Sequence, residues 1–448
     1  MRLSVLPVVR VFAFPDSRRR LAIASAVCAA LAYVAIGVLQ WARLGTGNVT
    51  TGDWRFFFSG ASALARGADP YRTIETCCRG RFDATQGYVY PPLFGELLRP
   101  LVPLGEVASG RAWLILSHLC FGLAVLVVWR TIGRWLTVTE RCVLLVMACL
   151  FLPLLRSLEM VQAGALLLLL TALAAQSFIE NPTSAAAGFW IAFATVLRVS
   201  PVFLSFALVR TWRFPRAPVL ALVCSLGVLV GFMAITTPFA TTFVTSVMPR
   251  LSQGSDYFQN VSLGAAVGRT ALLATGSEPA PLRAAVLGVS AVLVAATWLM
   301  TRAADGPRGR AAVIAAWITL AAIVSPITWQ HTLASELLAI ALLLGLSRST
   351  LDRTLLVCAY AMLWPTQVIQ SVAYAVSGGR LDGWHLVPFT IVSNINLGGM
   401  LLLWSLNLVC LRREGRAPYA LTGSLAGSPA STSGSGVTWA GAARDDRR

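Results

Sequence analysis

Apolar residues along the chain gather in long runs that are separated by short polar segments. A membrane-spanning helix needs about 20 mostly apolar residues, and eleven runs are of roughly this size. The pattern therefore predicts an all-α, polytopic membrane protein. We expect helices over residues 21–39, 112–129, 141–155, 161–178, 185–209, 218–235, 282–300, 311–324, 332–346, 355–374 and 387–411.

The fifth run, residues 185–209, is longer than one span requires and carries Arg198 and Pro201 near its middle. Two structures fit this pattern: two short segments that meet at a break, or one long helix kinked at Pro201. A break at membrane depth is tolerated where the loosened backbone is buried in protein or lines a cavity.

Arginine clusters between the runs favour the break. Basic loops stay on the cytoplasmic side of a membrane, and strict alternation puts all the clusters there only if the fifth run counts as two segments. The chain then has about 11–12 transmembrane helices, and twelve crossings place both termini in the cytoplasm. The clusters are Arg18–Arg20, Arg130/Arg134/Arg141, Arg210/Arg213/Arg216, Arg302/Arg308/Arg310, Arg348/Arg353 and Arg412/Arg413/Arg416.

The composition leaves no room for a sizeable soluble domain. Of the 448 residues 56% are apolar and only 12% charged, whereas soluble domains carry about 25% charged residues. We expect a cytoplasmic N-terminus (1–20), a transmembrane domain (21–411) whose first span is retained rather than cleaved, and a disordered cytoplasmic tail (412–448) rich in Gly, Ser, Ala and Thr.

The net charge of +17 comes from arginine alone. Because these arginines form short clusters beside apolar runs, they act as loop anchors, and nucleic-acid binding is not expected. Seven of the nine cysteines lie in or beside apolar runs, and only Cys77-Cys78 lies in a polar loop. No Cys-x-x-Cys spacing occurs, so neither a metal site nor another cofactor is expected.

The predicted topology collects most of the chemically interesting residues on the outer face. Asp53 follows the first span, directly before an aromatic segment suited to a helix at the membrane interface. As an alternative, Asp53 is only the N-cap of that helix, with Arg55 as its partner. Tyr88 and Tyr90 precede two prolines, and Gln162 opens an apolar run. These tyrosines can stack on a sugar or belong to the aromatic belt of the interface.

Further outer-face candidates come from three later segments. Arg198 at the break needs an anion to offset its charge, and a guanidinium suits phosphate. A long loop with the properties of a lid or an acceptor-binding segment contains Tyr257, Asn260 and Ser262, and Arg269 follows it. Trp329 and His331 lie between two spans, where a histidine can donate to phosphate or carry a proton. Together these residues predict one extracytoplasmic cavity.

These motifs resemble those of glycosyltransferase family 87. The resemblance covers about residues 20–411 and rests on an Asp after the first span, Tyr-Pro-Pro at 90–92, a Gln that opens a helix, Arg-x-x-Pro at 198–201, Asn-x-Ser at 260–262 and Ser-Pro-x-x-Trp-x-His at 325–331. It implies a GT-C fold and transfer from a polyprenyl-phosphate sugar, usually mannose and in some members arabinofuranose.

The resemblance also implies roles for individual residues. Asp53 matches the candidate catalytic aspartate, and Arg198 matches a basic residue expected to bind phosphate. Gln162, Asn260, Ser262 and His331 match cavity positions. The family often has an Asn soon after the Gln, whereas Ala163-Gly164-Ala165 follow here, so the identity of the sugar stays open.

We therefore expect a multi-pass enzyme of the cell membrane whose site faces the extracytoplasmic side. Asp53 is the general base, and Arg198, assisted by His331 and Arg269, binds the donor phosphate, so direct attack inverts the sugar. The expected partners are a polyprenyl-phosphate-linked sugar, a glycolipid or glycan acceptor and the bilayer. A lipid-linked-sugar transporter or flippase and a non-catalytic scaffold are the alternatives; the transporter requires a polar path to both faces.

Overall fold

The computed structural model describes part of the chain, and every structural statement below refers to that part. The predicted N-terminal segment up to residue 14 and the predicted tail after residue 422 lie outside it. The described residues are 15–44, 46, 52–72, 75–77, 84–209, 216–255, 257, 259–276, 280–302, 304–364, 369, 372, 375, 376 and 386–422.

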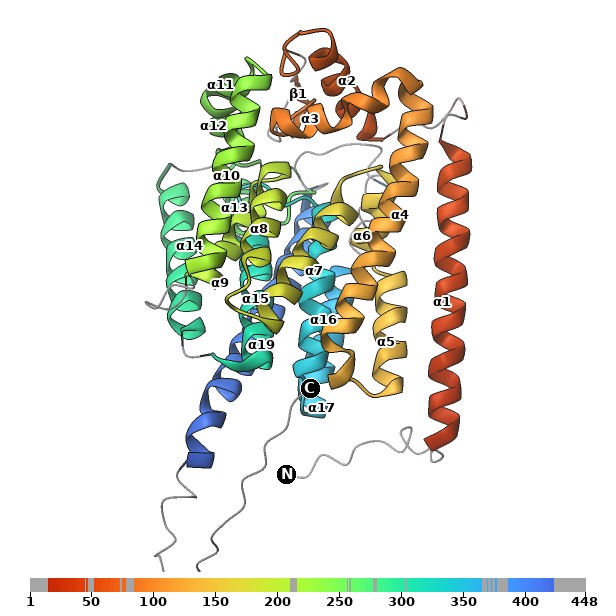
Figure 1. The fold of residues 1–448 in the computed structure, drawn as a ribbon, viewed down its shortest axis with the longest axis vertical. Coiled ribbons are helices and arrows are strands. Elements are labelled where there is room, and N and C mark those ends of the chain that lie inside the picture. The colour runs from red at the N-terminus through yellow and green to blue at the C-terminus, as the bar shows by residue number, and fades with distance from the viewer. Residues whose placement is uncertain are drawn as a thin grey trace, which may run out of the picture.

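Helices make up nearly all of the described chain (Figure 1). A two-stranded antiparallel hairpin, β1 (Glu75–Cys77) with β2 (Ala84–Gln86), lies beside them. The α-helices are α1 (Pro15–Arg43), α2 (Trp54–Ala65), α3 (Pro92–Leu98), α4 (Gly105–Ile132), α5 (Val138–Cys149), α6 (Leu152–Glu159), α7 (Gly164–Glu180), α8 (Ala185–Leu197), α9 (Ser205–Leu208), α10 (Arg216–Thr236), α11 (Ala240–Thr242), α12 (Met248–Ser252), α13 (Leu263–Thr275), α14 (Ala280–Thr301), α15 (Gly306–Val324), α16 (Glu336–Leu346), α17 (Thr350–Leu363) and α19 (Leu386–Thr422). Shorter 3-10 or π segments are η2 (Arg99–Leu104), η3 (Gly133–Trp135), η4 (Ser200–Leu204), η5 (Phe243–Val247) and η6 (Gln330–Ser335).

Seven helical segments in the described ranges are long and apolar enough to cross a membrane, and four shorter apolar helices accompany them. This confirms the predicted polytopic, all-helical class, while the count of twelve crossings stays a prediction. The start of α1 and the end of α19 lie at the same end of the bundle (Figure 1), as an even number of crossings requires. α19 runs on to Thr422, past the predicted domain end at residue 411.

The predicted break in the fifth run is confirmed. α8 ends at Leu197, Arg198 is extended with φ −156°, and the chain resumes as η4 and α9. Pro201 lies in the first turn of η4, where its missing N–H leaves no helical hydrogen bond unmade. The two segments therefore meet at Arg198 instead of forming one kinked helix.

The segment between α10 and α14 differs from the expectation of a plain outer loop. It contains α11, η5, α12 and α13. α13 is a 13-residue helix with Ser262 as its N-cap and Gly276 in the left-handed conformation at its C-cap. It is too short to give the hydropathy signal of a span, and for this reason the sequence pattern missed it.

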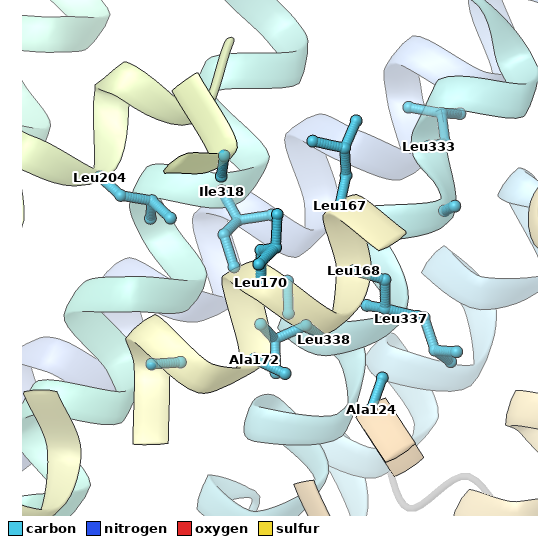
Figure 2. Close-up of a cluster of buried hydrophobic side chains, with 14 of the residues drawn as sticks. Ala124, Leu167, Leu168, Leu170, Ala172, Leu204, Ile318, Leu333, Leu337 and Leu338 are labelled. Atoms are coloured by element: carbon cyan, nitrogen blue, oxygen red, sulfur yellow. The ribbon is translucent and has the colours of Figure 1, made fainter. Parts of the chain in front are cut away.

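The core of the bundle is built around α7. Leu167, Leu168, Leu170 and Ala172 of α7 point toward side chains of the neighbouring helices in Figure 2. These partners are Ala124 of α4, Leu204 of η4, Ile318 of α15, Leu333 of η6 and Leu337 and Leu338 of α16. Most residues of α7 are buried in this way, so α7 lies at the centre of the bundle, and Gln162 lies just before its first turn.

A cap of short helices, α2 and α3 with the hairpin beside them, covers one end of the bundle (Figure 1). Trp54 anchors this cap: its indole donates to the carbonyl oxygen of Glu106 (3.0 Å) and to Ser109 Oγ (3.1 Å) on α4. The buried ring of Tyr88 packs against Gly60 and Gly95, where an added Cβ would come within 3 Å of it. The cap is therefore fixed in place above the bundle.

Arginines fix the opposite end. The guanidinium of Arg141 donates to the carbonyl oxygen of Gly133, that of Arg310 to Ile179, and that of Arg308 to Gly345. Each of these carbonyls lies at or beside the last turn of another helix, where unpaired carbonyl groups and the helix dipole favour a cation.

Candidate active site

Asp53 precedes α2 but does not cap it with its side chain. Its backbone N–H donates to the carbonyl oxygen of Met160 (3.1 Å), which ties the start of α2 to the turn between α6 and α7. Gly52 makes this approach possible: it has φ +58°, and a Cβ there would lie 3.0 Å from the Met160 backbone. The N-cap explanation for Asp53 therefore does not account for its carboxylate.

The turn between α6 and α7 positions Gln162 through a strained backbone at the preceding residue. Val161 has φ +54° and is buried, and for a β-branched residue this conformation costs about 1–3 kcal/mol. The N–H of Gln162 donates to Ser157 O (2.8 Å), and the indole of Trp113 donates to Gln162 O (3.4 Å). The surrounding contacts thus force a backbone that aims the Gln162 amide toward Asp53.

Asp53, Gln162 and Tyr90 form a continuous hydrogen-bonded chain. Gln162 Nε2 donates to Asp53 Oδ2, and Gln162 Oε1 accepts from the Tyr90 hydroxyl at 3.0 Å. Burial raises the pKa of Tyr90 to about 12, so the hydroxyl keeps its proton and fixes the orientation of the amide. None of the described residues donates a hydrogen bond to the second carboxylate oxygen of Asp53, Oδ1.

The environment of Asp53 makes its carboxylate a stronger base. Burial raises its pKa above the ordinary value, while the hydrogen bond from Gln162 and the charges of Arg156 and Arg55 oppose that rise. The guanidinium of Arg55 itself stacks on the Phe56 ring, with its Cζ 4.6 Å from the ring centroid.

Arg198 lines a cavity of about 290 Å³, which we call the Arg198 cavity. Tyr90 and Trp329 contribute to the same wall, together with the backbone break before Ser200. The remaining lining is largely apolar. It comes from η4, η5 and α12, for example Phe203, Phe243 and Leu251, and from residues before α3 and residues 324–327. A guanidinium in an apolar cavity suits an anionic group with a hydrocarbon chain.

His331 follows Trp329, which lines this cavity, by two residues, and the charges of Arg198 and Arg156 act on its ring. Arg156 also acts on Asp53, so it belongs to the site although the sequence motifs did not single it out. The sequence could have pointed to Arg156 by its position. It lies on the 8-residue helix α6, which directly precedes the turn that holds Gln162.

The structure gives Asn260, Ser262 and Arg269 contacts with the backbone. Asn260 Nδ2 donates to Ser255 O and Pro326 O, and its Oδ1 accepts from the N–H groups of Ser262 and Thr328. The fully buried Arg269 donates to Tyr257 O (3.0 Å) and Asn260 O (2.7 Å). These contacts join residues 255–262 to residues 325–329.

The three residues therefore shape the cavity from behind its wall, and none of them is among the residues that line the Arg198 cavity. Tyr257 reaches the site through its ring, which packs edge-on against Trp329 with centroids 5.9 Å apart. Tyr88 is fully buried and donates to Pro91 O (2.7 Å). A direct contact of Arg269 with donor phosphate stays a prediction. Within the described ranges, no group of three or more His, Cys, Asp or Glu side chains is placed to hold a metal ion.

A known protein family matches the part of the chain that contains most of these motifs. The sequence profile of glycosyltransferase family 87 matches residues 88–326, just over half of the chain. This match confirms the resemblance and, with the helical architecture, the GT-C fold class, and it favours the transferase over the transporter and the scaffold. No curated protein sequence matches the chain significantly.

Two similar solved structures are ArnT from Cupriavidus metallidurans bound to undecaprenyl phosphate and the apo oligosaccharyltransferase of Archaeoglobus fulgidus. Each is 13% identical in sequence, with TM-scores of 0.43 and 0.41. The first match covers 89% of this chain and 79% of ArnT, and the second covers 95% and 59%. The family assignment rests on the sequence profile alone.

Proposed function

Because the chain belongs to glycosyltransferase family 87, we propose that it transfers a sugar, mannose in the first instance, from a polyprenyl phosphate to a hydroxyl group of a cell-envelope glycolipid or glycan. The observation that carries this proposal is the chain Asp53–Gln162–Tyr90 beside the Arg198 cavity. It puts a basic carboxylate next to a cationic, mostly apolar cavity.

The reaction follows from this arrangement. The Asp53 carboxylate takes the proton of the acceptor hydroxyl as the acceptor oxygen attacks the anomeric carbon of the donor. The bond from that carbon to the phosphate oxygen breaks, and its electron pair leaves with polyprenyl phosphate. A single displacement inverts the anomeric centre. The proton stays on Asp53 until water removes it.

Arg198 stabilises the charge that the phosphate gains as it leaves, by charge-assisted hydrogen bonds. His331, which lies near Arg198, is the second candidate donor to the phosphate. The apolar wall formed by residues such as Phe203 and Leu251 accommodates the first isoprene units. Gln162 holds Asp53 in one orientation without neutralising it.

The proposed orientation places the cap and Asp53 on the extracytoplasmic side of the cell membrane. It is supported by the arginines that bind helix ends at the opposite end of the bundle, because arginine-rich loops stay in the cytoplasm. A lipid-linked donor also suits this side, since the membrane itself delivers it.

The test is transfer of radiolabelled sugar from polyprenyl-phosphate mannose, and separately arabinose, in membranes that contain Asp53→Asn. We expect transfer to fall by at least about 10²-fold, the usual contribution of a general base, while binding of donor lipid is retained. Asp69→Asn is the matched control, because Asp69 is an outer-end carboxylate that accepts from the Tyr71 N–H. Turnover by purified Asp53→Asn at the wild-type rate contradicts the proposal.

A further inference from the structure

A second cavity opens between α1, α4 and α6, and we call it the Arg156 groove. It has a volume of about 630 Å³ and shares no lining residue with the Arg198 cavity. Its charged residues are Arg43, Arg156 and Glu159, and Glu159 pairs with Arg156 at 2.7 Å. The described lining residues thus carry two cations and one anion.

The walls of this groove are those of a lipid site. Ile36 and Leu39 of α1 face Leu152 and Leu155 of α6 across it. Leu39 is 55% exposed, so the groove is open sideways, where the acyl chains of a bilayer would surround α1. A free sugar or a soluble glycan gains nothing from such walls, whereas burying a hydrocarbon chain is favourable by about 25 cal/mol per Å².

A polar atom without a partner marks where a headgroup would lie. Gln40 lines the groove, and its amide Nε2 donates to Leu155 O at 3.3 Å. Its Oε1 is buried and has no hydrogen-bond partner among the described residues. Such an oxygen costs free energy unless a donor reaches it, and a headgroup hydroxyl supplies one next to the carboxylate of Glu159.

The lining of the groove reaches the residue that precedes Gln162 in the sequence. Val161 belongs to its lining, and the next residue, Gln162, holds Asp53. The charge of Arg156 acts on both Asp53 and His331. Val161 thus connects the groove to the residue that holds Asp53, and Tyr90 connects Gln162 to the Arg198 cavity. A transferase needs two substrates.

We infer that the Arg156 groove binds the acceptor, and that the acceptor is a membrane lipid with an anionic, hydroxyl-bearing headgroup. The assignment of this lipid as the acceptor rests on the proposed function. The headgroup phosphate binds Arg43 and Arg156, its hydroxyls reach Gln40 and Glu159, and its tails leave between α1 and α6. Donor and acceptor then approach Asp53 separately, each along its own hydrocarbon-lined path.

The experiment uses the full-length protein in phosphatidylcholine nanodiscs that contain phosphatidylglycerol, an anionic lipid with headgroup hydroxyls. Native mass spectrometry counts the phosphatidylglycerol molecules retained per protein. We expect Arg43→Gln and Leu39→Trp each to lower apparent affinity about tenfold or more, as loss of a charged hydrogen bond or blockage of the path requires. Arg99→Gln is the control, since Arg99 is an exposed arginine of η2 whose only ion pair among the described residues is with the neighbouring Glu96.

A second measurement links binding to catalysis. With membrane lipid extract as acceptor, Arg43→Gln raises the KM for acceptor and leaves the KM for donor unchanged. Equal retention of phosphatidylglycerol by wild type, Arg43→Gln and Leu39→Trp overturns the inference. So does displacement of the lipid by millimolar inorganic phosphate, which indicates a phosphate site, or transfer to a soluble oligosaccharide that Leu39→Trp does not impair. Because lipid retention is measured without turnover, its failure is distinguishable from failure of the proposed reaction.

Discussion

Two aspartates at opposite ends of the bundle show how differently this protein uses the same side chain. Asp352, in the first turn of α17, accepts from Arg413 at 2.6 Å and from the N–H groups of Arg348 and Ser349 at 3.1 Å. Asp53, before α2, accepts from the neutral amide of Gln162. One carboxylate is held by a cation and the other by an amide.

The pKa values of the two carboxyls move in opposite directions. Burial raises the pKa of Asp352, but the hydrogen bonds from Arg413, Arg348 and Ser349 outweigh it and hold the pKa at about 2. Burial also raises the pKa of Asp53, and there the opposing contacts do not cancel the rise. The first carboxylate is too weak a base to take a proton near neutral pH, while the second gains basicity.

The comparison indicates that, at the Asp352 end of the bundle, pairing with arginine makes an acid structural. Other acids at the Asp352 end follow the same rule: Glu140 pairs with Arg353 and Glu414 with Arg348, both at 2.5 Å. An amide partner instead fixes the direction of a carboxylate and leaves its chemistry intact. The loss of Asp53 should therefore affect catalysis, as tested above by Asp53→Asn, and the loss of Asp352 should affect stability.

The largest further effect is expected for Gln162→Glu, which replaces the neutral partner of Asp53 by a second carboxyl of the same shape. Two carboxylates in contact cannot both ionise easily, so the shared pKa rises. Transfer at neutral pH should fall about tenfold or more and recover as the pH is raised. The measurement is the pH dependence of kcat/KM, whose acidic limb moves to higher pH than in wild type.

Gln162→Met is the matched control, since it keeps the volume and removes both hydrogen bonds. It should lose activity at every pH, because Asp53 is then unoriented. An unchanged acidic limb in Gln162→Glu would mean that Asp53 is not the group whose ionisation governs the rate.

A smaller effect, on stability alone, is expected for Asp352→Asn. The change breaks the pair with Arg413 and weakens the N-cap box formed with Ser349, so it should lower the free energy of unfolding by about 1–3 kcal/mol. The pKa of Asp352 is depressed by folding. Its contribution to stability is thus present above the pKa of the unfolded aspartate and is lost as the pH falls toward 2.

Thermal unfolding of the purified protein in detergent, together with the transfer rate at permissive temperature, checks this prediction. A lowered unfolding temperature with an unchanged rate fits it. A lost transfer rate in a protein of normal stability would show that Asp352 acts in catalysis and not in stability.

The smallest effect is expected for Arg353→Gln. Its partner Glu140 is mostly buried, but the side chain of Arg353 is 52% exposed, and pairs screened by water contribute about 0–1 kcal/mol. The unfolding temperature should change little at physiological salt, and the remaining difference should shrink at high salt. A loss as large as that of Asp352→Asn would place the Glu140 pair among the buried ones.

Hydropathy predicted the long helices and the break at Arg198, because both leave a local mark on the sequence. The motifs also named Asp53, Tyr90, Gln162 and Arg198, which the structure brings to one end of the bundle. The hydrogen bond between Asp53 and Gln162 joins residues 109 positions apart, and only the packing of α2 against the α6–α7 turn creates it.

Other features left no local mark. α13 is shorter than a span, Arg156 belongs to no motif, and Asn260 and Arg269 turned out to bind backbone carbonyls behind the cavity wall. A polar residue in an outer segment can face a substrate or fasten two loops together, and its type is the same in both cases. Distinguishing the two requires the position of the partner groups, which the sequence does not supply.

The arginines that close the ends of α4, α7 and α16 have a consequence for the making of the protein. While the chain is being inserted, a positively charged residue resists transfer across the membrane and so decides which way the neighbouring helix enters. In the finished bundle the guanidinium groups of Arg141, Arg308 and Arg310 bind the carbonyl oxygens of helices that arrived separately. One side chain thus first orients its own helix during synthesis and afterwards joins it to another.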